Sequence, residues 1–208
     1  MRIGILGGSF NPVHNGHLRL ALEVMEQVPL DRVDLVPASS PPHKSGKKLF
    51  SFDFRCSLLE AVAEIHPELH VNSLEGKRQG PSYTVDTLGE YHRDSPESSL
   101  FFILGCSDFL TLSTWHEWQE IATLTNFAVT GRFGEGSEDL EEYIFQKWPK
   151  AWCKSRSPLI WELPGGKEVH YILAPRLDIS ASLIRQKLED SLSLSFLVPE
   201  KVEQMLLG

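Results

Sequence analysis

Short apolar runs alternate along this chain with longer stretches in which apolar residues recur every three or four positions. The runs predict β-strands at residues 2–6, 33–36, 70–74, 100–104, 127–130 and 168–173. The longer stretches predict helices at residues 18–28, 52–65, 83–92, 138–148, 180–189 and 199–207. Because strands and helices alternate, we expect an α/β protein with a doubly wound parallel sheet and with ligands at the carboxyl ends of the strands.

The arrangement of apolar residues within each element predicts how deeply it is buried. Residues 100–104 are almost purely apolar, which is typical of a central strand covered on both faces. At 208 residues the chain can bury a full core as one domain, residues 1–208, to which the helical segment 180–208 belongs. In the first two helices we expect the following residues to face inward: Leu18, Ala21, Leu22, Met25, Cys56, Leu59, Val62 and Ala63.

Charge and cysteine content narrow the function. A formal net charge of -8 argues against a nucleic-acid-binding surface, so an anionic substrate must be held by local positive groups. The three cysteines are widely separated and odd in number, which predicts reduced thiols in a cytoplasmic protein. The first strand leaves no room for a signal peptide and no apolar stretch approaches transmembrane length, so we expect no association with a membrane.

The segment between the first strand and the first helix carries candidate chemistry. Gly7 and Gly8 let the backbone turn sharply and approach a ligand closely, and the next helix begins with N–H groups that could hold an anion. His14 and His17 lie one helical turn apart and should point the same way. One such histidine alone would more simply be a surface polar group. The whole string instead favours a polyphosphate site.

This string, Gly-Gly-Ser-Phe-Asn-Pro-Val-His-Asn-Gly-His, resembles the signature of nucleotidyltransferases with a His-x-Gly-His element, most of all the nicotinate-nucleotide adenylyltransferases. That family usually has Thr at Ser9 and Asp at Asn11. Both exchanges are small and polar, and the second removes a negative charge beside the phosphates. The resemblance implies a Rossmann-like nucleotidyltransferase fold with a small helical C-terminal part. It implies catalytic or ATP-binding roles for Gly8, Ser9, Phe10, His14 and His17.

Two further segments resemble the family's phosphate-binding elements. Residues 37–44 match Pro-x-x-x-Pro-Pro-His-Lys, which implies that Lys44 contacts the nucleotide phosphates with His43 nearby; alone, this segment would be read as a solvated loop. Residues 178–185 match Ile-Ser-x-[Ser/Thr]-x-x-Arg, which implies that Ser180 binds ATP and that Arg185 binds ATP and acts in catalysis. Arginine suits this role because its charge is permanent and its planar fork matches phosphate oxygens.

A third segment, residues 80–88, resembles the family's contact with the pyridine carboxylate. Ser82 or Thr84 could cap the helix that follows, whose first turn offers N–H groups. Taken alone, the segment is only a capped helix. The resemblance implies that Ser82, Tyr83 and Thr84 contact the acceptor, partly through backbone amides. A nest of neutral donors can recognise a carboxylate without a full counter-charge.

A fourth segment follows the strand at residues 100–104. The family has Gly-x-Asp and then a tryptophan, here Gly105 and Trp115, which implies an ATP contact at the first and a ring stacked on the pyridine at the second. His116, where related sequences often carry tyrosine, is also expected at the acceptor. The family's aspartate position is Ser107, and the carboxylate is Asp108. Either Asp108 reaches the ATP site through a remodelled turn, or Ser107 substitutes for the aspartate.

The chemistry of an adenylyltransferase explains this set of residues. The phosphate of a mononucleotide attacks the α-phosphorus of ATP and expels pyrophosphate. Its second pKa is about 6, so it needs no general base, and the protein has only to position the reactants and stabilise charge. We expect Mg²⁺ held mainly by the triphosphate and water, because no carboxylate cluster marks a protein metal site. A zinc pair at His14 and His17 lacks a third ligand at suitable spacing.

The sequence therefore predicts transfer of the adenylyl group of ATP to nicotinate mononucleotide, giving nicotinate adenine dinucleotide and pyrophosphate in NAD synthesis. One alternative is a transferase for another acceptor, such as nicotinamide mononucleotide, phosphopantetheine or a cytidylyl acceptor. Another is a non-catalytic nucleotide sensor on the same fold, against which His14, His17 and Arg185 argue. The sequence leaves open the oligomeric state (a homo-oligomer included), the strength of preference between acid and amide acceptors, and the role of the acidic segment 134–150.

Overall fold

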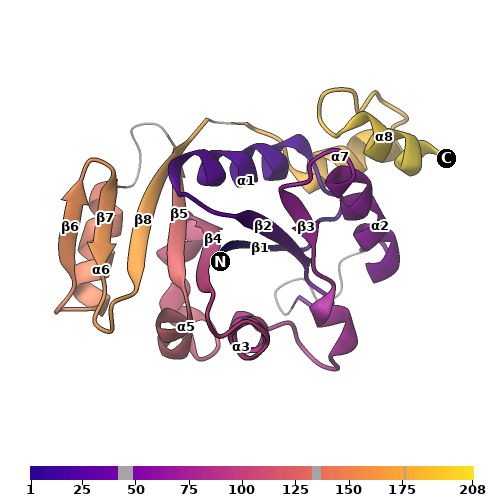
Figure 1. Ribbon diagram of the computed structural model, residues 1–208. Coiled ribbons are helices and arrows are strands. Elements are labelled where there is room, and N and C mark those ends of the chain that lie inside the picture. Colours follow the sequence, from indigo (N-terminus) through magenta and orange to yellow (C-terminus); the bar gives the residue numbers. More distant parts are fainter. Residues whose placement is uncertain (42–48, 133–136, 176) are drawn as a thin grey trace.

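The computed structural model describes residues 1–41, 49–132, 137–175 and 177–208 (Figure 1). These residues form an eight-stranded sheet with the strand order β3-β2-β1-β4-β5-β8-β7-β6. All pairings from β3 to β8 are parallel, and β7 and β6 are added antiparallel. The strands are β1 (Arg2–Gly8), β2 (Arg32–Pro37), β3 (Leu69–Val71), β4 (Ser99–Gly105), β5 (Asn126–Arg132), β6 (Trp152–Arg156), β7 (Leu159–Glu162) and β8 (Glu168–Ala174).

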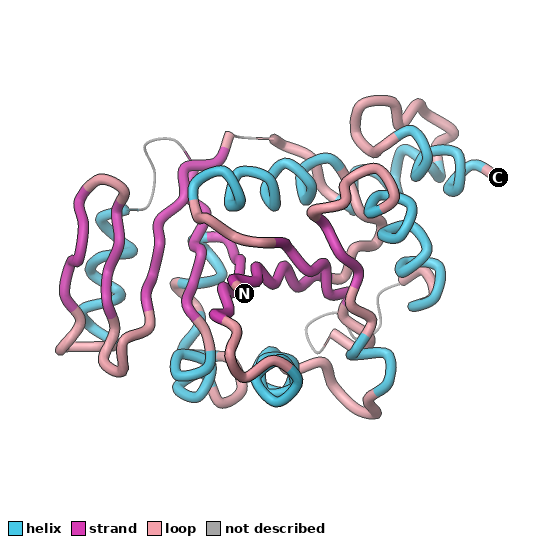
Figure 2. The backbone as a smooth tube through the Cα atoms, in the orientation of Figure 1, coloured by secondary structure: helices cyan, strands magenta, loops and turns pink. Residues whose placement is uncertain are grey.

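Helices cover both faces of the sheet, as predicted for a doubly wound fold, and the alternation of side chains along each strand creates two cores (Figures 1 and 2). Ile5 and Phe102 face one core, while Leu6 and Phe101 face the other. The first core is closed by α3 (Thr84–Asp94), α4 (Cys106–Phe109), α5 (Trp118–Leu124) and α6 (Ser137–Lys147). The second is closed by α1 (Asn15–Gln27), α2 (Phe52–Ala63), α7 (Ala181–Glu189) and α8 (Glu200–Leu207). Within the described ranges, no helix is both long and apolar enough to span a bilayer.

The strand order fixes where a ligand can bind. The chain moves from β1 outward through β2 to β3, and then returns to place β4 on the other side of β1. The loops after β1 and β4 therefore leave the sheet in opposite directions, and a crevice opens between them at the carboxyl ends of the strands. The segments after Gly8 and after Gly105 both begin there.

The structure corrects some sequence-based expectations. The strand predicted at 70–74 ends at Val71, because Asn72 Oδ1 accepts a hydrogen bond from the Leu74 N–H at 3.1 Å and a 3₁₀ helix, η2 (Leu74–Lys77), begins there. On α1 the buried positions are Leu18, Ala21 and Val24, whereas Leu22 and Met25 are half-buried, as is Ala63 on α2. The hairpin of β6 and β7 was not predicted; neither was the 3₁₀ helix η3 (Leu112–Thr114).

Helix α6 accounts for much of the acidic segment. Its apolar side buries Leu140 and Ile144 in the first core. On another side, Glu141 accepts hydrogen bonds from Arg156 Nη1 at 2.6 Å and from Trp161 Nε1 at 3.2 Å. The helix thereby fastens the hairpin of β6 and β7 to the sheet.

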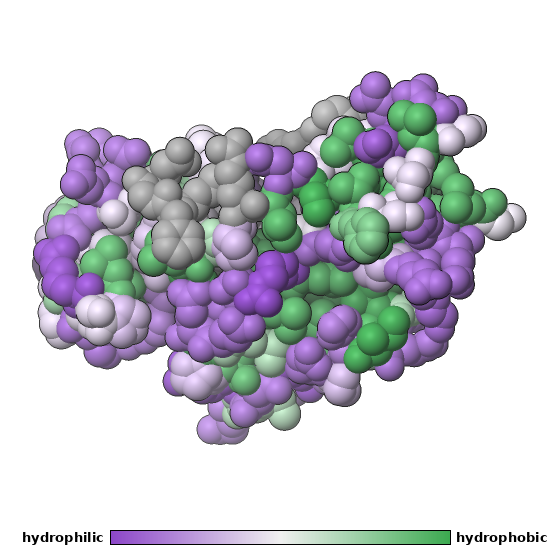
Figure 3. Space-filling view, turned by 90° about the horizontal axis from the view of Figure 1, so that it is seen from above, coloured by the Kyte–Doolittle hydropathy of each residue, from purple (hydrophilic) through white to green (hydrophobic). Residues whose placement is uncertain are grey.

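Seen from above α1, hydrophilic side chains cover much of the surface, and hydrophobic ones gather toward the C-terminal helices (Figure 3). Exposed apolar residues in that part of the chain include Leu192, Phe196 and Leu207.

A buried carboxylate lies on β2. Asp34 is 1% exposed; its Oδ1 accepts from Arg32 Nε and its Oδ2 from the Tyr91 hydroxyl, both at 2.8 Å. Burial and the neighbouring Asp34 charge raise the pKa of Tyr91, so the phenol remains a donor. Asn72 Nδ2 donates to the same hydroxyl at 2.9 Å.

Replacing Tyr91 by Phe would remove the shorter of the two hydrogen bonds to Asp34 Oδ2 and leave only Arg32 Nη2, at 3.2 Å, so we expect Tyr91→Phe to lower the free energy of unfolding by roughly 2–3 kcal/mol. Tyr143→Phe is the matched control, because the Tyr143 hydroxyl accepts from the uncharged Ser113 N–H, at 2.9 Å, and not from a group bonded to a carboxylate. Its expected loss is about 1 kcal/mol. Urea denaturation of both variants measures the difference, and equal losses would contradict the role given to Asp34.

Candidate active site

The loop after β1 turns back over the end of its own strand. Phe10 has φ = 41°, in the left-handed region that bulky residues rarely adopt, and its ring is buried. That ring packs against His17 with centroids 4.9 Å apart, and a Cβ on Gly8 would lie 3.3 Å from it. Phe10 thus fixes the loop against α1, and the close approach of its ring favours glycine at position 8.

His14 and His17 lie at the first turn of α1 and point the same way, as their spacing predicted, with their rings stacked at 3.6 Å between centroids. The His14 N–H donates to Nδ1 of His17 at 3.3 Å, so a neutral His17 carries its proton on Nε2 and can donate from that atom. His14 is 6% exposed, and burial lowers its pKa to about 4. Its Nδ1 is buried without a hydrogen-bond partner among the described residues. His14 is therefore uncharged at neutral pH.

The helix α7 brings its arginine to the same loop. Ser180 caps α7, and its Oγ accepts from the Leu183 N–H at 3.1 Å. From one turn into the helix, Arg185 Nη1 donates to the Asn11 carbonyl at 2.7 Å, and Nη2 donates to Ser182 Oγ at 3.2 Å. The guanidinium therefore lies against the loop between β1 and α1.

A second C-terminal segment holds the first residue of α1. The Asn15 N–H donates to the Leu197 carbonyl at 2.9 Å, and Asn15 Nδ2 donates to the Phe196 carbonyl at 2.8 Å. Phe196 has φ = 66°, and its side chain is 91% exposed. The Leu197 carbonyl supplies a partner for a main-chain N–H that a helix N-terminus does not satisfy for itself, and the Phe196 carbonyl holds the Asn15 side chain.

On the other face of the sheet, a cavity of about 560 Å³ opens at the ends of β1, β2 and β4. Its volume is in the range usual for small-ligand pockets. Gly8 and Ser9 line it, so it reaches the loop that faces α1. The residues expected at the acceptor all line it as well: Ser82, Tyr83, Thr84, Trp115 and His116.

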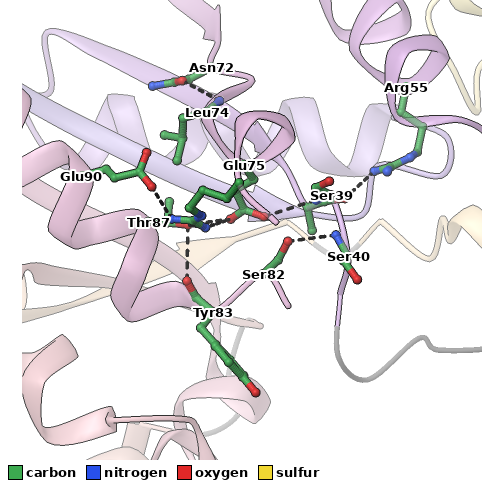
Figure 4. A network of polar contacts seen from close by, with 12 residues as sticks. Ser39, Ser40, Arg55, Asn72, Leu74, Glu75, Ser82, Tyr83, Thr87 and Glu90 are labelled. Atoms are coloured by element: carbon green, nitrogen blue, oxygen red, sulfur yellow. Dashed lines mark hydrogen bonds and ion pairs between the residues drawn. The ribbon is translucent and has the colours of Figure 1, made fainter. Parts of the chain in front are cut away.

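Hydrogen bonds join two walls of the cavity (Figure 4). The Ser40 N–H donates to Ser82 Oγ at 3.0 Å, and the Ser82 N–H donates to the Ser40 carbonyl at 2.9 Å. Glu75, on η2, accepts from the Ser39 N–H at 3.3 Å and from the Thr87 hydroxyl at 2.7 Å (Figure 4). Because Ser82 is engaged in this way, Tyr83 is the N-cap of α3, and the predicted capping by Ser82 or Thr84 is wrong.

Aromatic rings line another part of the cavity. Trp115 packs edge-on against Phe102, with centroids 6.1 Å apart. The His116 ring lies 4.3 Å from the Tyr83 ring, and its Nε2 is 3.9 Å from Glu117. Flat faces of this kind suit a planar heteroaromatic ligand.

The turn after β4 carries both candidates for the family's aspartate position. A Cβ on Gly105 would lie 3.7 Å from Asp108 Oδ2 and 3.8 Å from Ser107 Oγ, so both side chains lie beside that glycine. Asp108 is exposed on α4, yet the surrounding protein removes enough water to raise its pKa. The geometry therefore fits either alternative: Asp108 can reach the ATP site, or Ser107 can take the place of the family's aspartate.

The structure thus brings the expected residues to one edge of the sheet from both of its faces. His43 and Lys44 lie outside the described residues. Sequence reasoning missed Arg55, which is 1% exposed on α2 and donates to the Ser9 and Ala38 carbonyls at 2.7 and 2.9 Å. It also missed the buried Glu75. For Arg55 the sequence did offer a signal, because this charged residue occupies an inward position on the otherwise apolar face of α2.

Comparison with known proteins agrees with this geometry. A cytidylyltransferase-like family model matches residues 5–187. A protein of Geobacter metallireducens named "Probable nicotinate-nucleotide adenylyltransferase" is 39% identical over 202 residues, which cover 97% of this chain and 94% of that protein. A protein of Geotalea daltonii with the same name is 38% identical, covering 98% and 94%.

Solved structures share the fold. The nicotinic acid mononucleotide adenylyltransferase of Plasmodium falciparum, complexed with NaAD, superposes with a TM-score of 0.74 at 18% identity, covering 99% of this chain and 94% of that one. A structure from Vibrio parahaemolyticus, described as a putative nicotinate-nucleotide adenylyltransferase, gives a TM-score of 0.66 at 18% identity, covering 100% and 99%.

The buried His14 predicts a pH dependence of stability. An unfolded chain protonates this residue below about pH 6.5, whereas the folded chain does so only near pH 4, so stability falls as the pH drops between these values. The expected loss from His14 alone is about 2 kcal/mol between pH 7 and pH 5.

Urea denaturation of His14→Gln across this range should show a shallower fall than the parent chain. The exposed His70 on β3 supplies the control, and His70→Gln should follow the parent curve. Parallel curves for the parent chain and His14→Gln would refute the assignment of a neutral, buried His14.

Proposed function

We propose that this chain, which belongs to the nicotinate-nucleotide adenylyltransferase family, transfers the adenylyl group of ATP to nicotinate mononucleotide. A phosphate oxygen of the mononucleotide forms a bond to the α-phosphorus of ATP, while the bond from that phosphorus to the bridging oxygen of the β-phosphate breaks. The products are nicotinate adenine dinucleotide and pyrophosphate. The reaction is a step of NAD biosynthesis.

One observation carries this proposal: the aromatic cavity and the loop of stacked histidines meet at Gly8 and Ser9. The cavity lies on the α3 and α5 face of the sheet, and the histidines lie on the α1 face. A ligand in each half would bring its reacting phosphate to the same strand end. This arrangement supports transfer between two nucleotides more than storage of one.

On the ATP side we assign Gly8, Ser9, Phe10, Gly105 and Ser180 to binding, together with Lys44 and Asp108. We assign catalytic roles to His14, His17 and Arg185. A neutral His17 with its proton on Nε2 can donate to a phosphoryl oxygen as charge develops. Arg185 can spread its fixed charge over the triphosphate, since its guanidinium already lies at the loop that would hold it. No general base is needed, because the acceptor phosphate is largely ionised at neutral pH.

On the acceptor side we propose that the pyridine ring of the mononucleotide stacks on Trp115, with Tyr83 and His116 beside it. The pyridine carboxylate would lie at the start of α3, against Ser82, Tyr83 and Thr84. It would take hydrogen bonds from the Ser82 hydroxyl and from Thr84, because the N–H groups of Ser82 and Tyr83 already donate to the Ser40 and Pro81 carbonyls. The first turn of a helix directs N–H groups outward, which favours an anion. The hydrogen bonds between Ser40 and Ser82 hold this turn at the cavity wall.

Family members of this type act on ATP together with a divalent ion, and we propose that Mg²⁺ enters as part of the nucleotide substrate. Within the described ranges, no group of three or more His, Cys, Asp or Glu side chains could hold a metal. A triphosphate and water can complete the octahedral shell that this ion prefers. We also propose a cytoplasmic location, since the thiols of Cys56, Cys106 and Cys153 fit a reducing compartment.

The acceptor preference tests the substrate. The NH₂ group of nicotinamide mononucleotide is a hydrogen-bond donor and cannot accept from the donors of the α3 turn. Each donor left unpaired in this way costs roughly 1–3 kcal/mol of binding free energy. We therefore expect kcat/KM for the acid to exceed that for the amide by about 5- to 150-fold per mismatch. A pyrophosphate-release assay with ATP and each mononucleotide measures it. Equal values, or a preference for the amide, would favour another acceptor, and no release with any mononucleotide would favour a sensor.

A second test concerns His17. We expect His17→Ala to lower kcat by on the order of 10²–10³ with a smaller change in KM for ATP, because the donor acts mainly as charge develops. His66→Ala, a half-buried histidine beyond the end of α2, is the control. Turnover of His17→Ala within a few-fold of the parent enzyme would remove His17 from the catalytic group.

A further inference from the structure

Arg55 is a buried arginine between the two halves of the site. It lies on α2 and is 1% exposed. In the described part of the chain its hydrogen bonds all end on main-chain carbonyls: Nη1 donates to Ser9 at 2.7 Å and to Ala38 at 2.9 Å, and Nε donates to Phe50 at 3.1 Å. Burial lowers the pKa of Arg55, yet a guanidinium keeps its charge in proteins. A charge this deeply buried is costly, which calls for a role beyond packing.

The positions of the bonded carbonyls indicate that role. Ser9 belongs to the loop that approaches ATP, and Ala38 belongs to the wall of the acceptor cavity. The ladder between β1 and β2 ends at the hydrogen bond from the Ala38 N–H to the Gly8 carbonyl, at 2.8 Å. Beyond this point the two loops diverge, one toward α1 and one toward Ser82. Arg55 spans the point of divergence, and Figure 4 shows its side chain reaching the loop that carries Ser39.

A third anchor extends the connection. The Phe50 carbonyl accepts from Arg55, and the Phe50 N–H donates to Asn11 Oδ1 at 2.8 Å. The Asn11 carbonyl in turn accepts from Arg185. One chain of hydrogen bonds therefore runs from the acceptor wall through Arg55 to the arginine of α7.

We propose that Arg55 is a positioning residue for adenylyl transfer, holding the ATP loop at Ser9 and the acceptor wall at Ala38 in fixed register. The proposal rests on the proposed function. In-line attack requires the acceptor phosphate to lie about 3–3.5 Å from the α-phosphorus, and a misplacement of 1 Å can cost on the order of 10² in rate. Each substrate binds in its own half of the site. A shift of one half relative to the other should therefore lower the rate of transfer more than it weakens the binding of either substrate.

The test separates binding from turnover in Arg55→Met and Arg55→Lys. Calorimetry with ATP alone and with nicotinate mononucleotide alone gives each dissociation constant and the number of competent sites. Turnover divided by that number is free of any loss of folded protein. We expect kcat per site to fall about 100-fold in Arg55→Met, with both dissociation constants within about fivefold of the parent values.

Lysine keeps the charge but cannot reach carbonyls on three segments at once. We therefore expect Arg55→Lys to resemble Arg55→Met more than the parent enzyme, whereas full recovery would mean that charge alone matters and would overturn the proposal. Arg19→Met, which removes an arginine paired with Glu23 on the surface of α1, is the control and should turn over normally.

Other outcomes are equally decisive. If kcat per site in Arg55→Met stays within threefold of the parent value, Arg55 is not a positioning residue. If neither Arg55→Met nor Arg55→Lys binds either nucleotide, Arg55 is a residue of folding only. A parent enzyme that binds both nucleotides but forms no dinucleotide would refute the proposed function rather than the role of Arg55.

Discussion

Parallel strands lose their regular hydrogen bonding at their carboxyl ends, and this site depends on how that loss is replaced. The ladder between β1 and β2 stops at Gly8 and Ala38. Side chains then connect the segments that leave the sheet: Arg55 reaches Ser9 and Ala38, and Arg185 reaches Asn11. Each of these bonds satisfies a main-chain carbonyl that would otherwise need water. The loops after β1 and β2 are consequently tied to α2 and α7 by hydrogen bonds to their carbonyls.

The same arrangement reconciles an acidic protein with polyanionic substrates. The net charge is -8, so attraction at long range does not bring phosphates to the surface. Positive charge is instead supplied at the strand ends by Arg55 and Arg185, whose guanidinium groups donate to main-chain carbonyls, with the carboxylate of Glu75 near enough to Arg55 to interact with its charge. His14 adds no charge at neutral pH, because its burial favours the neutral ring. Recognition therefore depends on short-range geometry, which discriminates between similar anions better than a broad positive field.

Local patterns in the sequence were enough to predict the parallel strands, the long helices and the common direction of the two histidines, because each depends on residues a few positions apart. The order of motifs, read through family resemblance, also predicted which residues gather at the cavity. What could not be predicted depends on contacts across the fold. Arg55 occupies an inward position on α2, but the carbonyls of Ser9 and Ala38 that it binds come from distant segments, and Ser82 is a plausible helix cap until Ser40 occupies its hydroxyl. In the hairpin, β6 is half exposed and β7 is only four residues long, and the attachment of the hairpin relies on Glu141 of α6, which is distant in sequence.

The hold of Phe196 and Leu197 on Asn15 has a consequence for the order in which the protein is made. The side chain of Asn15 and the carbonyl it binds are 181 residues apart, so they meet only late in synthesis. A nascent chain that has left the ribosome as far as Arg185 already contains every motif for recognising nucleotides. It still lacks the two carbonyls that fasten the first turn of α1. The first residue of α1 therefore gains these two partners only once residues 196 and 197, which have no assigned part in recognition, are in place.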